Sequence, residues 1–106
     1  MAADRNRQQI KQVILKYADN LKKQYHIKGI YLYGSYAKGN STEESDIDLA
    51  VVSDDFTGDL IEDTFRLMQL RRKIDYRIEP RPFSASDFNE ENPDAREVIQ
   101  TGVRIV

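Results

Sequence analysis

Hydrophobic positions recur along the first half of the chain with two different periods. Across residues 5–26 the apolar side chains are three and four positions apart, which predicts an amphipathic helix. These side chains are Ile10, Val13, Ile14, Tyr17 and Leu21. Residues 29–34 and 46–53 are short β-branched, aromatic and aliphatic runs, which predict two strands.

The second half of the chain continues with alternating elements. A helix is predicted over 59–71, and an alternating pattern predicts a strand over 73–79 that stops at Pro80. Pro93 at a first helical position and Gly102 after the last predict a short helix over 93–101. The inner side of the helix over 59–71 is predicted to carry Leu60, Ile61, Thr64, Leu67 and Met68.

Residues 103–106 complete this order as a predicted edge strand. The elements together predict an α+β fold, a small mixed β-sheet with helices on one face. The other face of the sheet is expected to remain open as a cleft.

Two aspartates that begin one predicted strand are the strongest chemical signal. Successive side chains of a strand point to opposite faces, so Asp46 and Asp48 share a face about 6.6 Å apart along the backbone, while Ile47 faces the opposite side. Two carboxylates at this separation suit a pair of divalent cations about 3.5–4 Å apart. Mg²⁺ prefers such oxygen ligands together with phosphate oxygens and water.

A glycine-serine pair lies upstream of these acids, where the strand over 29–34 ends. Gly34 allows a phosphate group to approach the backbone closely, and the Ser35 hydroxyl is suited to bind a phosphate oxygen. A short helix beginning at Ser35 would direct its free N–H groups toward that phosphate. Lys38 is either a further cation for the phosphates or a solvated surface lysine.

Asp75 is the candidate for a third carboxylate, because it lies in the predicted strand over 73–79. If that strand pairs beside residues 46–52, Asp75 comes next to the acidic pair. Three such charges repel one another, and bound cations relieve that repulsion.

The segment from Gly34 to Gly39 and the segment from Ser45 to Val52 together resemble the signature of the DNA polymerase beta-type nucleotidyltransferase superfamily. The small size resembles its minimal nucleotidyltransferase (MNT) branch, and the resemblance extends from about residue 5 to the end. It implies one minimal nucleotidyltransferase domain over 1–106. It further implies that Asp46 and Asp48 bind metal, that Gly34 and Ser35 hold a triphosphate, and that Asp75 is a metal ligand or the base.

The resemblance also implies a reaction and its cofactors. An acceptor hydroxyl attacks the α-phosphate of ATP with the help of two Mg²⁺ ions, and pyrophosphate leaves. Many MNT proteins resemble antitoxins that transfer AMP onto a tyrosine of a HEPN-type toxin, and we expect such a protein partner here. Two alternatives stay open, namely transfer onto a small molecule resembling an aminoglycoside, as a dimer or with a helical partner, and inhibition of a partner by binding without catalysis.

The composition of the chain excludes several classes of protein. The 106 residues suffice for one domain, and the net charge of −2 gives no general attraction to nucleic acid. No apolar stretch approaches the roughly 20 residues that span a bilayer, and residues 1–7 lack the apolar segment of a secretory signal. The absence of cysteine excludes disulfides and zinc-thiolate sites. These features predict a cytoplasmic protein.

Overall fold

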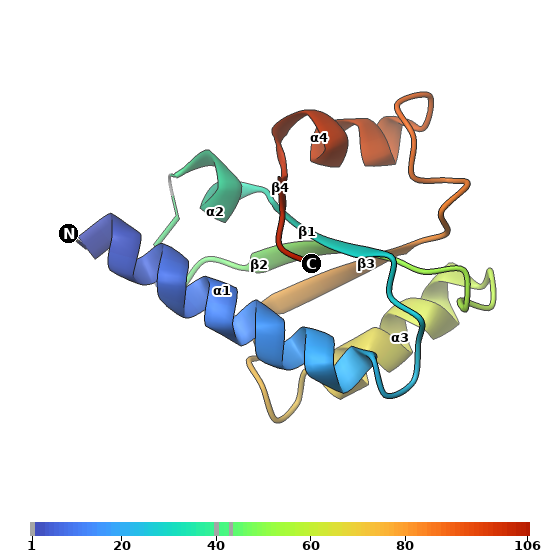
Figure 1. The fold of residues 1–106 in the computed structure, drawn as a ribbon, viewed down its shortest axis with the longest axis horizontal. Coiled ribbons are helices and arrows are strands. Elements are labelled where there is room, and N and C mark those ends of the chain that lie inside the picture. The colour runs from blue at the N-terminus through green and yellow to red at the C-terminus, as the bar shows by residue number, and fades with distance from the viewer. Residues whose placement is uncertain (1, 40, 43) are drawn as a thin grey trace.

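The computed structural model describes residues 2–39, 41–42 and 44–106, and their side chains from Arg7 onward. Four helices and four strands alternate along this part of the chain (Figure 1). In order, they are α1 (Ala2–Leu21), β1 (Gly29–Tyr33), α2 (Ser35–Lys38), β2 (Ile47–Val52), α3 (Leu60–Leu70), β3 (Ile78–Phe83), α4 (Pro93–Thr101) and β4 (Val103–Arg104).

The four strands form one mixed sheet in the order β3-β2-β1-β4. Strand β1 is antiparallel to both of its neighbours, β2 and β4, whereas β2 and β3 are parallel. The expected α+β class, the mixed sheet and the final edge strand are therefore confirmed.

The larger hydrophobic core lies between the sheet and the two longest helices. Ile47, Leu49 and Val51 of β2 point into it and are fully buried against α1 and α3. Helix α1 is tied to α3 by the Tyr17 hydroxyl, which donates to the Leu67 carbonyl oxygen at 2.6 Å. The amphipathic pattern of the first helix is thus confirmed, although the helix ends at Leu21 rather than at residue 26.

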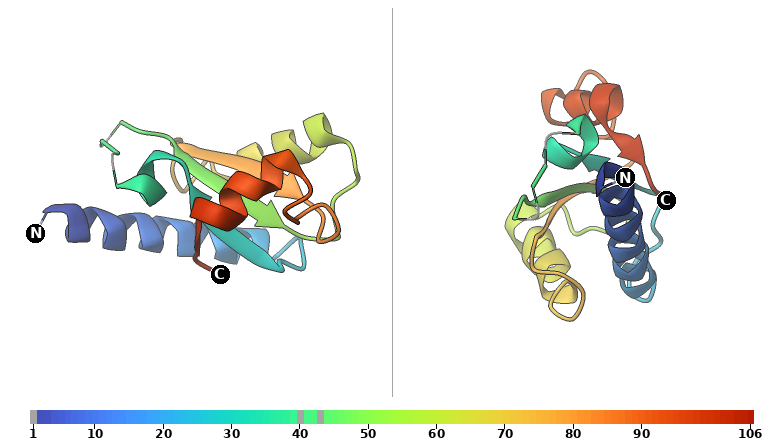
Figure 2. Two further views of the ribbon diagram at one scale, coloured as in Figure 1. Left: turned by 90° about the horizontal axis from the view of Figure 1, so that it is seen from above. Right: turned by 90° about the vertical axis from the view of Figure 1, so that its left-hand side faces the viewer.

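A second, smaller core covers part of the opposite face of the sheet. Ala50 and Val52 of β2 pack there with Ala95 and Val98 of α4. Figure 2 shows the sheet with α1 and α3 on one side and α4 on the other. The expectation that helices cover one face only is corrected here, because α4 packs on the face opposite α1 and α3.

Helix α3 begins one residue after its predicted start, with Asp59 as its N-cap, but its inner side differs from the prediction. The Asp59 carboxylate accepts hydrogen bonds from the N–H groups of Ile61 and Glu62, at 3.0 and 3.2 Å. Leu67 is buried as predicted, whereas Leu60 and Ile61 are exposed. Their predicted place is taken by Asp63, which is buried because its carboxylate accepts hydrogen bonds from the preceding loop.

Strand β3 is displaced along the chain from its predicted position. It runs over Ile78–Phe83, through Pro80 and Pro82, while residues 73–77 form the turn before it. The Ile47 N–H donates to the Arg77 carbonyl oxygen, and the Ser53 N–H donates to the Phe83 carbonyl oxygen. The backbone N–H and C=O groups of the odd-numbered residues of β3 therefore point toward β2, and those of the even-numbered residues point away from it. Both prolines therefore place their missing N–H groups on the free edge of the sheet, where no partner strand needs them.

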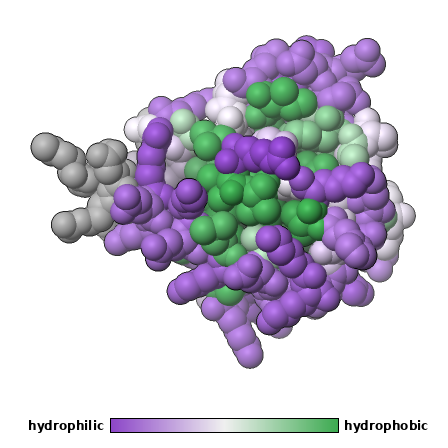
Figure 3. All heavy atoms as spheres, viewed as in Figure 1, coloured by the Kyte–Doolittle hydropathy of each residue, from purple (hydrophilic) through white to green (hydrophobic). Residues whose placement is uncertain are grey.

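The surface reflects this layered arrangement. Among the described residues, no helix combines the length and the apolar character required to cross a bilayer. Figure 3 shows hydrophobic side chains gathered at the centre of the face on which α1 and β4 lie in front, with hydrophilic side chains bordering them.

Candidate functional site

One row of polar side chains crosses three strands at the open end of the sheet. Tyr33 of β1 is the register partner of Asp48 in β2, and Asp48 is the register partner of Glu79 in β3. Register partners on neighbouring strands point to the same face of a sheet, about 4.8 Å apart. The row therefore places two carboxylates side by side, on the face that α4 only partly covers.

Asp48 is the electrostatic centre of this row. Partial burial raises the pKa of the Asp48 carboxyl, and the nearby charges of Asp46, Glu79 and Glu97 raise it further. Among the described residues, no hydrogen bond or ion pair reaches the carboxylates of Asp46 or Asp48. The negative charges of Asp46 and Asp48 are thus left without a described protein partner, which is the condition that a bound cation relieves.

Gly34 lies directly against Asp48. Its backbone has φ 73° and ψ −147°, a region essentially restricted to glycine, and a Cβ atom added there would lie 2.2 Å from Asp48 Oδ2. The glycine that sequence analysis assigned to phosphate approach therefore also makes room for the carboxylate. Because β1 ends one residue earlier, at Tyr33, and Tyr33 is the register partner of Asp48, adjacent strands hold the turn against the carboxylate.

Helix α2 follows this turn, and its start at Ser35 agrees with the expected short helix. The first N–H groups of a helix have no acceptor within it and are available to a bound anion. Lys38 Nζ lies 3.4 Å from Glu97 Oε1 of α4, and both side chains are about half exposed. Lys38 therefore lies at the rim of the site, where its ion pair with Glu97 competes with any phosphate contact.

Asp75 occupies a different position from the one predicted. It lies in the turn before β3, and Arg77 Nη2 contacts Asp75 Oδ2 at 2.7 Å while the Arg77 N–H donates to Oδ1 at 2.9 Å. Hydrogen bonds from Arg77 lower the pKa of the Asp75 carboxyl. The predicted strand position of Asp75 was wrong because the chain is still turning at this residue.

Glu79 is the residue that sequence analysis missed. Its carboxylate is 46% exposed and lies 3.6 Å from Arg71 Nη1, at the end of α3. In an alternating pattern over 73–79, Asp75, Arg77 and Glu79 share one face, so the signal for Glu79 is present in the sequence. The assumption that Pro80 ends the strand hid it, because Glu79 then became the last residue rather than the second.

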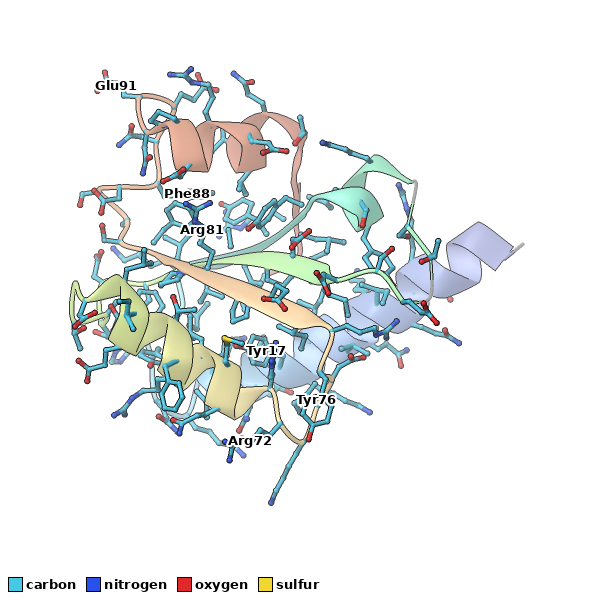
Figure 4. The ribbon with its side chains drawn as sticks, turned by 180° about the vertical axis from the view of Figure 1, so that it is seen from behind. Tyr17, Arg72, Tyr76, Arg81, Phe88 and Glu91 are labelled. Carbon is cyan, nitrogen blue, oxygen red and sulfur yellow. The ribbon has the colours of Figure 1, made fainter. Side chains whose placement is uncertain are left out.

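The surrounding side chains form the wall of the site toward α4. Arg81 lies two residues beyond Glu79 on the same strand, and its Nη2 atom is 3.0 Å from Asp94 Oδ2. Burial raises the pKa of the Tyr33 hydroxyl, the Asp48 charge raises it further, and the Arg81 guanidinium lowers it. Figure 4 shows Arg81 near Phe88 on the α4 side of the sheet, whereas Tyr17 lies on the opposite side.

The donor set of the site fits a divalent cation. Asp46, Asp48 and Glu79 offer carboxylate oxygens, the ligand type that Mg²⁺ prefers. Within the described part of the chain, no three histidine, cysteine, aspartate or glutamate side chains converge on one point. The Glu79 carboxylate is paired with Arg71, so a cation held by all three acids requires this carboxylate to turn toward Asp48.

A mixed sheet that places uncompensated carboxylates beside a glycine-serine turn has the arrangement expected of a metal-dependent phosphoryl-transfer or nucleotidyl-transfer site. Comparison with known proteins agrees. The sequence profile described as "Polymerase beta, Nucleotidyltransferase" matches residues 9–106. The chain belongs to this nucleotidyltransferase family.

Curated relatives come from Methanocaldococcus jannaschii and carry the name "Putative protein adenylyltransferase". One is 39% identical over 66 residues, which are 62% of this chain and 66% of the relative. Another is 51% identical over 43 residues, which are 39% of this chain and 43% of the relative. The matched segments thus span between less than half and about two thirds of these relatives.

Solved structures share the fold. A crystal structure titled as a putative nucleotidyltransferase from Sulfolobus solfataricus has a TM-score of 0.71 at 15% identity, covering 98% of this chain and 86% of that one. A chain from a crystal structure of a toxin-antitoxin with AMP-PNP has a TM-score of 0.62 at 23% identity, and the match covers 91% of this chain and 72% of that one.

Proposed function

We propose that this protein is a Mg²⁺-dependent nucleotidyltransferase that moves AMP from ATP onto a hydroxyl group of a partner protein. The observation that carries the proposal is the pairing of Asp48 with Glu79 beside the glycine-serine turn. Membership of the nucleotidyltransferase family supports the reaction class, and the names of the curated relatives support a protein acceptor.

Asp46 and Asp48 are the residues we propose as metal ligands. Both carboxylates are free of protein donors among the described residues, and Asp48 is held at a fixed place by its strand. Bound Mg²⁺ would neutralise phosphate charge and lower the pKa of the attacking hydroxyl. The residues themselves supply the position and the negative charge that select a divalent ion at this end of the sheet.

Glu79 is our candidate for the third carboxylate, in place of Asp75. In the transfer step the acceptor oxygen forms a bond to the α-phosphorus, and the bond from that phosphorus to the α–β bridging oxygen breaks. Pyrophosphate leaves, and the hydroxyl proton passes to the Glu79 carboxylate as general base. Asp75 serves this site indirectly, since its ion pair with Arg77 orders the turn from which β3 begins.

The phosphate chain of ATP is assigned to the turn between β1 and α2. Helix α2 begins at Ser35, directly after Gly34, and Gly34 lies against Asp48, so we assign phosphate binding to the backbone N–H groups after Gly34 and to the Ser35 hydroxyl. Such preorganised donors stabilise phosphate charge without reorganisation during the reaction. Lys38 contributes once its side chain exchanges Glu97 for a phosphate oxygen.

A tyrosine of a HEPN-type toxin is the acceptor we propose, which makes this chain the antitoxin of the pair. The toxin-antitoxin assembly among the structural neighbours supports a protein partner. The compact catalytic sheet also exposes its acidic end beside α4, where a partner can present a hydroxyl. Because ATP is the proposed donor, we place the reaction in the cytoplasm.

Transfer of label from ATP tests the proposal. The chain is incubated with Mg²⁺ and ATP labelled at the α-phosphate, together with lysate of its own cells, and ATP labelled at the γ-phosphate serves as the control. We expect α-label, and no γ-label, on a tyrosine of one protein that co-purifies with the chain. Label on an aminoglycoside or similar small molecule would contradict a protein acceptor. Absence of label while the partner is still inhibited would contradict catalysis.

A further inference from the structure

A second concave surface lies on the other side of α2 from the acidic site. It is a groove of about 210 Å³ between α1, α2 and β4, and we call it the α1–β4 groove. Its lining consists of Arg7, Lys11, Leu32, Tyr36, Ala37, Val103, Arg104 and Ile105. None of the assigned steps of nucleotidyl transfer uses these residues.

The size of the groove indicates what kind of ligand fits it. Sites for whole small molecules usually enclose about 300–1,000 Å³. At about 210 Å³ this groove is smaller and open to solvent, so it suits one or two anchoring side chains of a polypeptide. Interfaces commonly place their energetically dominant anchors in pockets of this kind.

The charges of the groove indicate the chemistry of that polypeptide. Its lining is mostly apolar, and its charged residues among those described are all basic, namely Arg7, Lys11 and Arg104. The Arg104 guanidinium donates to the Lys28 and Val106 carbonyl oxygens and lies over the Tyr31 ring, so among these residues Arg7 and Lys11 supply the free positive charge of the rim. This contrasts with the whole chain, in which 18 acidic residues outnumber 16 basic ones. An apolar floor with a basic rim is complementary to apolar side chains flanked by carboxylates.

The groove also adjoins the open edge of the sheet. The strand order makes β4 the outer strand on this side, and the large side chain of Val103 is 45% exposed. Figure 3 shows this face, with its hydrophobic centre and hydrophilic border. An outer strand and an exposed apolar side chain are features that a bound partner segment would cover.

Tyr36 connects the groove to the catalytic end of the sheet. Its ring lines the groove, and its hydroxyl accepts a hydrogen bond from Arg77 Nη1 at 3.2 Å. Arg77 in turn holds Asp75 in the turn before β3. A segment bound in the groove would therefore lie one side chain away from the network that orders the site.

We infer that the α1–β4 groove is the docking site for a segment of the partner protein that carries apolar side chains between acidic ones. This inference deepens the proposed function, since it locates where the protein that accepts the nucleotide is held. The occupant is a different protein rather than a second copy, because the rim offers the cations of Arg7 and Lys11 and no described acid to pair with them across a symmetric contact.

Peptide titration of the isotopically labelled chain tests this docking site. The probe is a synthetic twelve-residue peptide in which one phenylalanine and one leucine are flanked by glutamates. One matched peptide replaces the glutamates by lysines, and another replaces the apolar residues by serines. We expect amide shifts at Ala37, Val103 and Ile105 with the first peptide alone. Equal shifts with the lysine peptide, shifts centred elsewhere, or no shifts at millimolar peptide would overturn the inference.

Charge reversal on α1 provides the matched variants. Lys11→Glu should weaken binding of the acidic peptide by about fivefold, because an attractive rim charge becomes repulsive. Lys16→Glu, which changes an exposed lysine of α1 outside the groove, should leave binding unchanged. A chain dimer that Lys11→Glu dissociates in sedimentation would assign the groove to a second copy and overturn the proposed partner.

The same variants separate this inference from the proposed function. Binding of Mg²⁺ and ATP is measured in parallel by calorimetry for the unaltered chain and for Lys11→Glu. If Lys11→Glu loses peptide binding but still binds ATP, the result supports the docking site and does not contradict the proposed transfer reaction. A chain that binds the peptide at the groove but never binds ATP would refute the proposed function and leave the docking site standing.

Discussion

Asp48 of β2 and Glu79 of β3 are direct register partners in parallel strands, on the same face of the sheet. Burial raises the pKa of the Asp48 carboxyl, and the charges of Asp46 and then Glu79 raise it further. Asp75 does not belong to this pair, because Arg77 holds its carboxylate in the preceding turn. The register of Asp48 and Glu79 is the reason that we propose Glu79, rather than Asp75, as the third carboxylate.

Substitution of these two candidates should separate their roles. Glu79→Gln removes the proposed general base, and we expect a loss of about 10²- to 10⁴-fold in the rate of transfer with little change in stability. Asp75→Asn removes the charged partner of Arg77, and we expect a loss of about 1–3 kcal/mol in the free energy of unfolding with transfer reduced less than tenfold. Initial rates with α-labelled ATP and urea unfolding measure the two effects.

The reversed outcome would restore the role that the sequence pattern gave to Asp75. If Asp75→Asn abolishes transfer in a stably folded chain while Glu79→Gln remains active, Asp75 is the third carboxylate. Asp19→Asn, on an exposed position of α1, controls for the loss of one negative charge and should change neither measurement.

The contrast between these two acids shows what the sequence could specify. The spacing of Asp46 and Asp48 and the preceding Gly34-Ser35 pair are local patterns, and the structure places Gly34 beside Asp48. The start of β3 was misjudged because proline was taken to end the strand, and our choice between Asp75 and Glu79 as the third carboxylate depends on that start. On an edge strand proline is tolerated when its nitrogen faces away from the neighbour, which is a property of the sheet rather than of the local sequence.

The helices show the same division between local and tertiary information. Helix α4 has its predicted bounds, because Asn92 caps it, Pro93 opens it and Gly102 follows it. Its position on the second face of the sheet could not be predicted, since periodicity identifies an apolar side but not the surface that covers it. In α3, the burial of Asp63 depends on hydrogen bonds with the preceding loop, so Asp63 lies inward where Leu60 and Ile61 were expected, while Leu67 is buried as predicted.

Removal of either proposed metal ligand should stop the reaction without unfolding the chain. Loss of a residue that only supports a metal ligand typically lowers metal affinity about 10- to 100-fold. Loss of a ligand itself should therefore lower metal affinity, and with it the rate of transfer, at least about 100-fold. We expect this for Asp46→Ala and Asp48→Ala, because neither carboxylate has a protein partner among the described residues. Transfer rates and circular dichroism check the prediction, and unchanged turnover in either variant would contradict the metal assignment.

Gly34 should tolerate no side chain. Gly34→Ala forces a residue into a glycine-only conformation and places its Cβ against Asp48 Oδ2, so we expect a loss of at least about 1–3 kcal/mol in stability together with loss of transfer. Gly39→Ala is the matched control. Gly39 also has a positive φ, but nothing lies within 4 Å of an added Cβ, so only about 1 kcal/mol should be lost and transfer should persist. Equal effects of both changes would show that the contact with Asp48 is unimportant.

The raised pKa of Asp48 predicts a dependence of stability on pH that metal should reverse. In the metal-free chain the folded state binds the Asp48 proton more tightly than the unfolded state does. Binding of this proton therefore favours folding at low pH. The contribution is lost as the pH rises from the ordinary pKa of an aspartate carboxyl through the raised pKa of Asp48 in the folded state. At pH 7 with a chelator, Asp48→Asn should consequently be more stable than the unaltered chain, and the difference should vanish below about pH 3.9.

Added Mg²⁺ should act in the opposite direction, since it competes with the proton for the same carboxylate. At ten times its dissociation constant, Mg²⁺ should stabilise the unaltered chain by about 1.4 kcal/mol at pH 7, and Asp48→Asn much less. Urea unfolding with Mg²⁺ or with chelator, at pH 7 and pH 4, measures both effects. If Mg²⁺ stabilised both chains equally, or the unaltered chain equally at both pH values, the ion would be binding somewhere other than Asp48. The acidic row would then have to be explained without a cation, although its own repulsion disfavours the folded state.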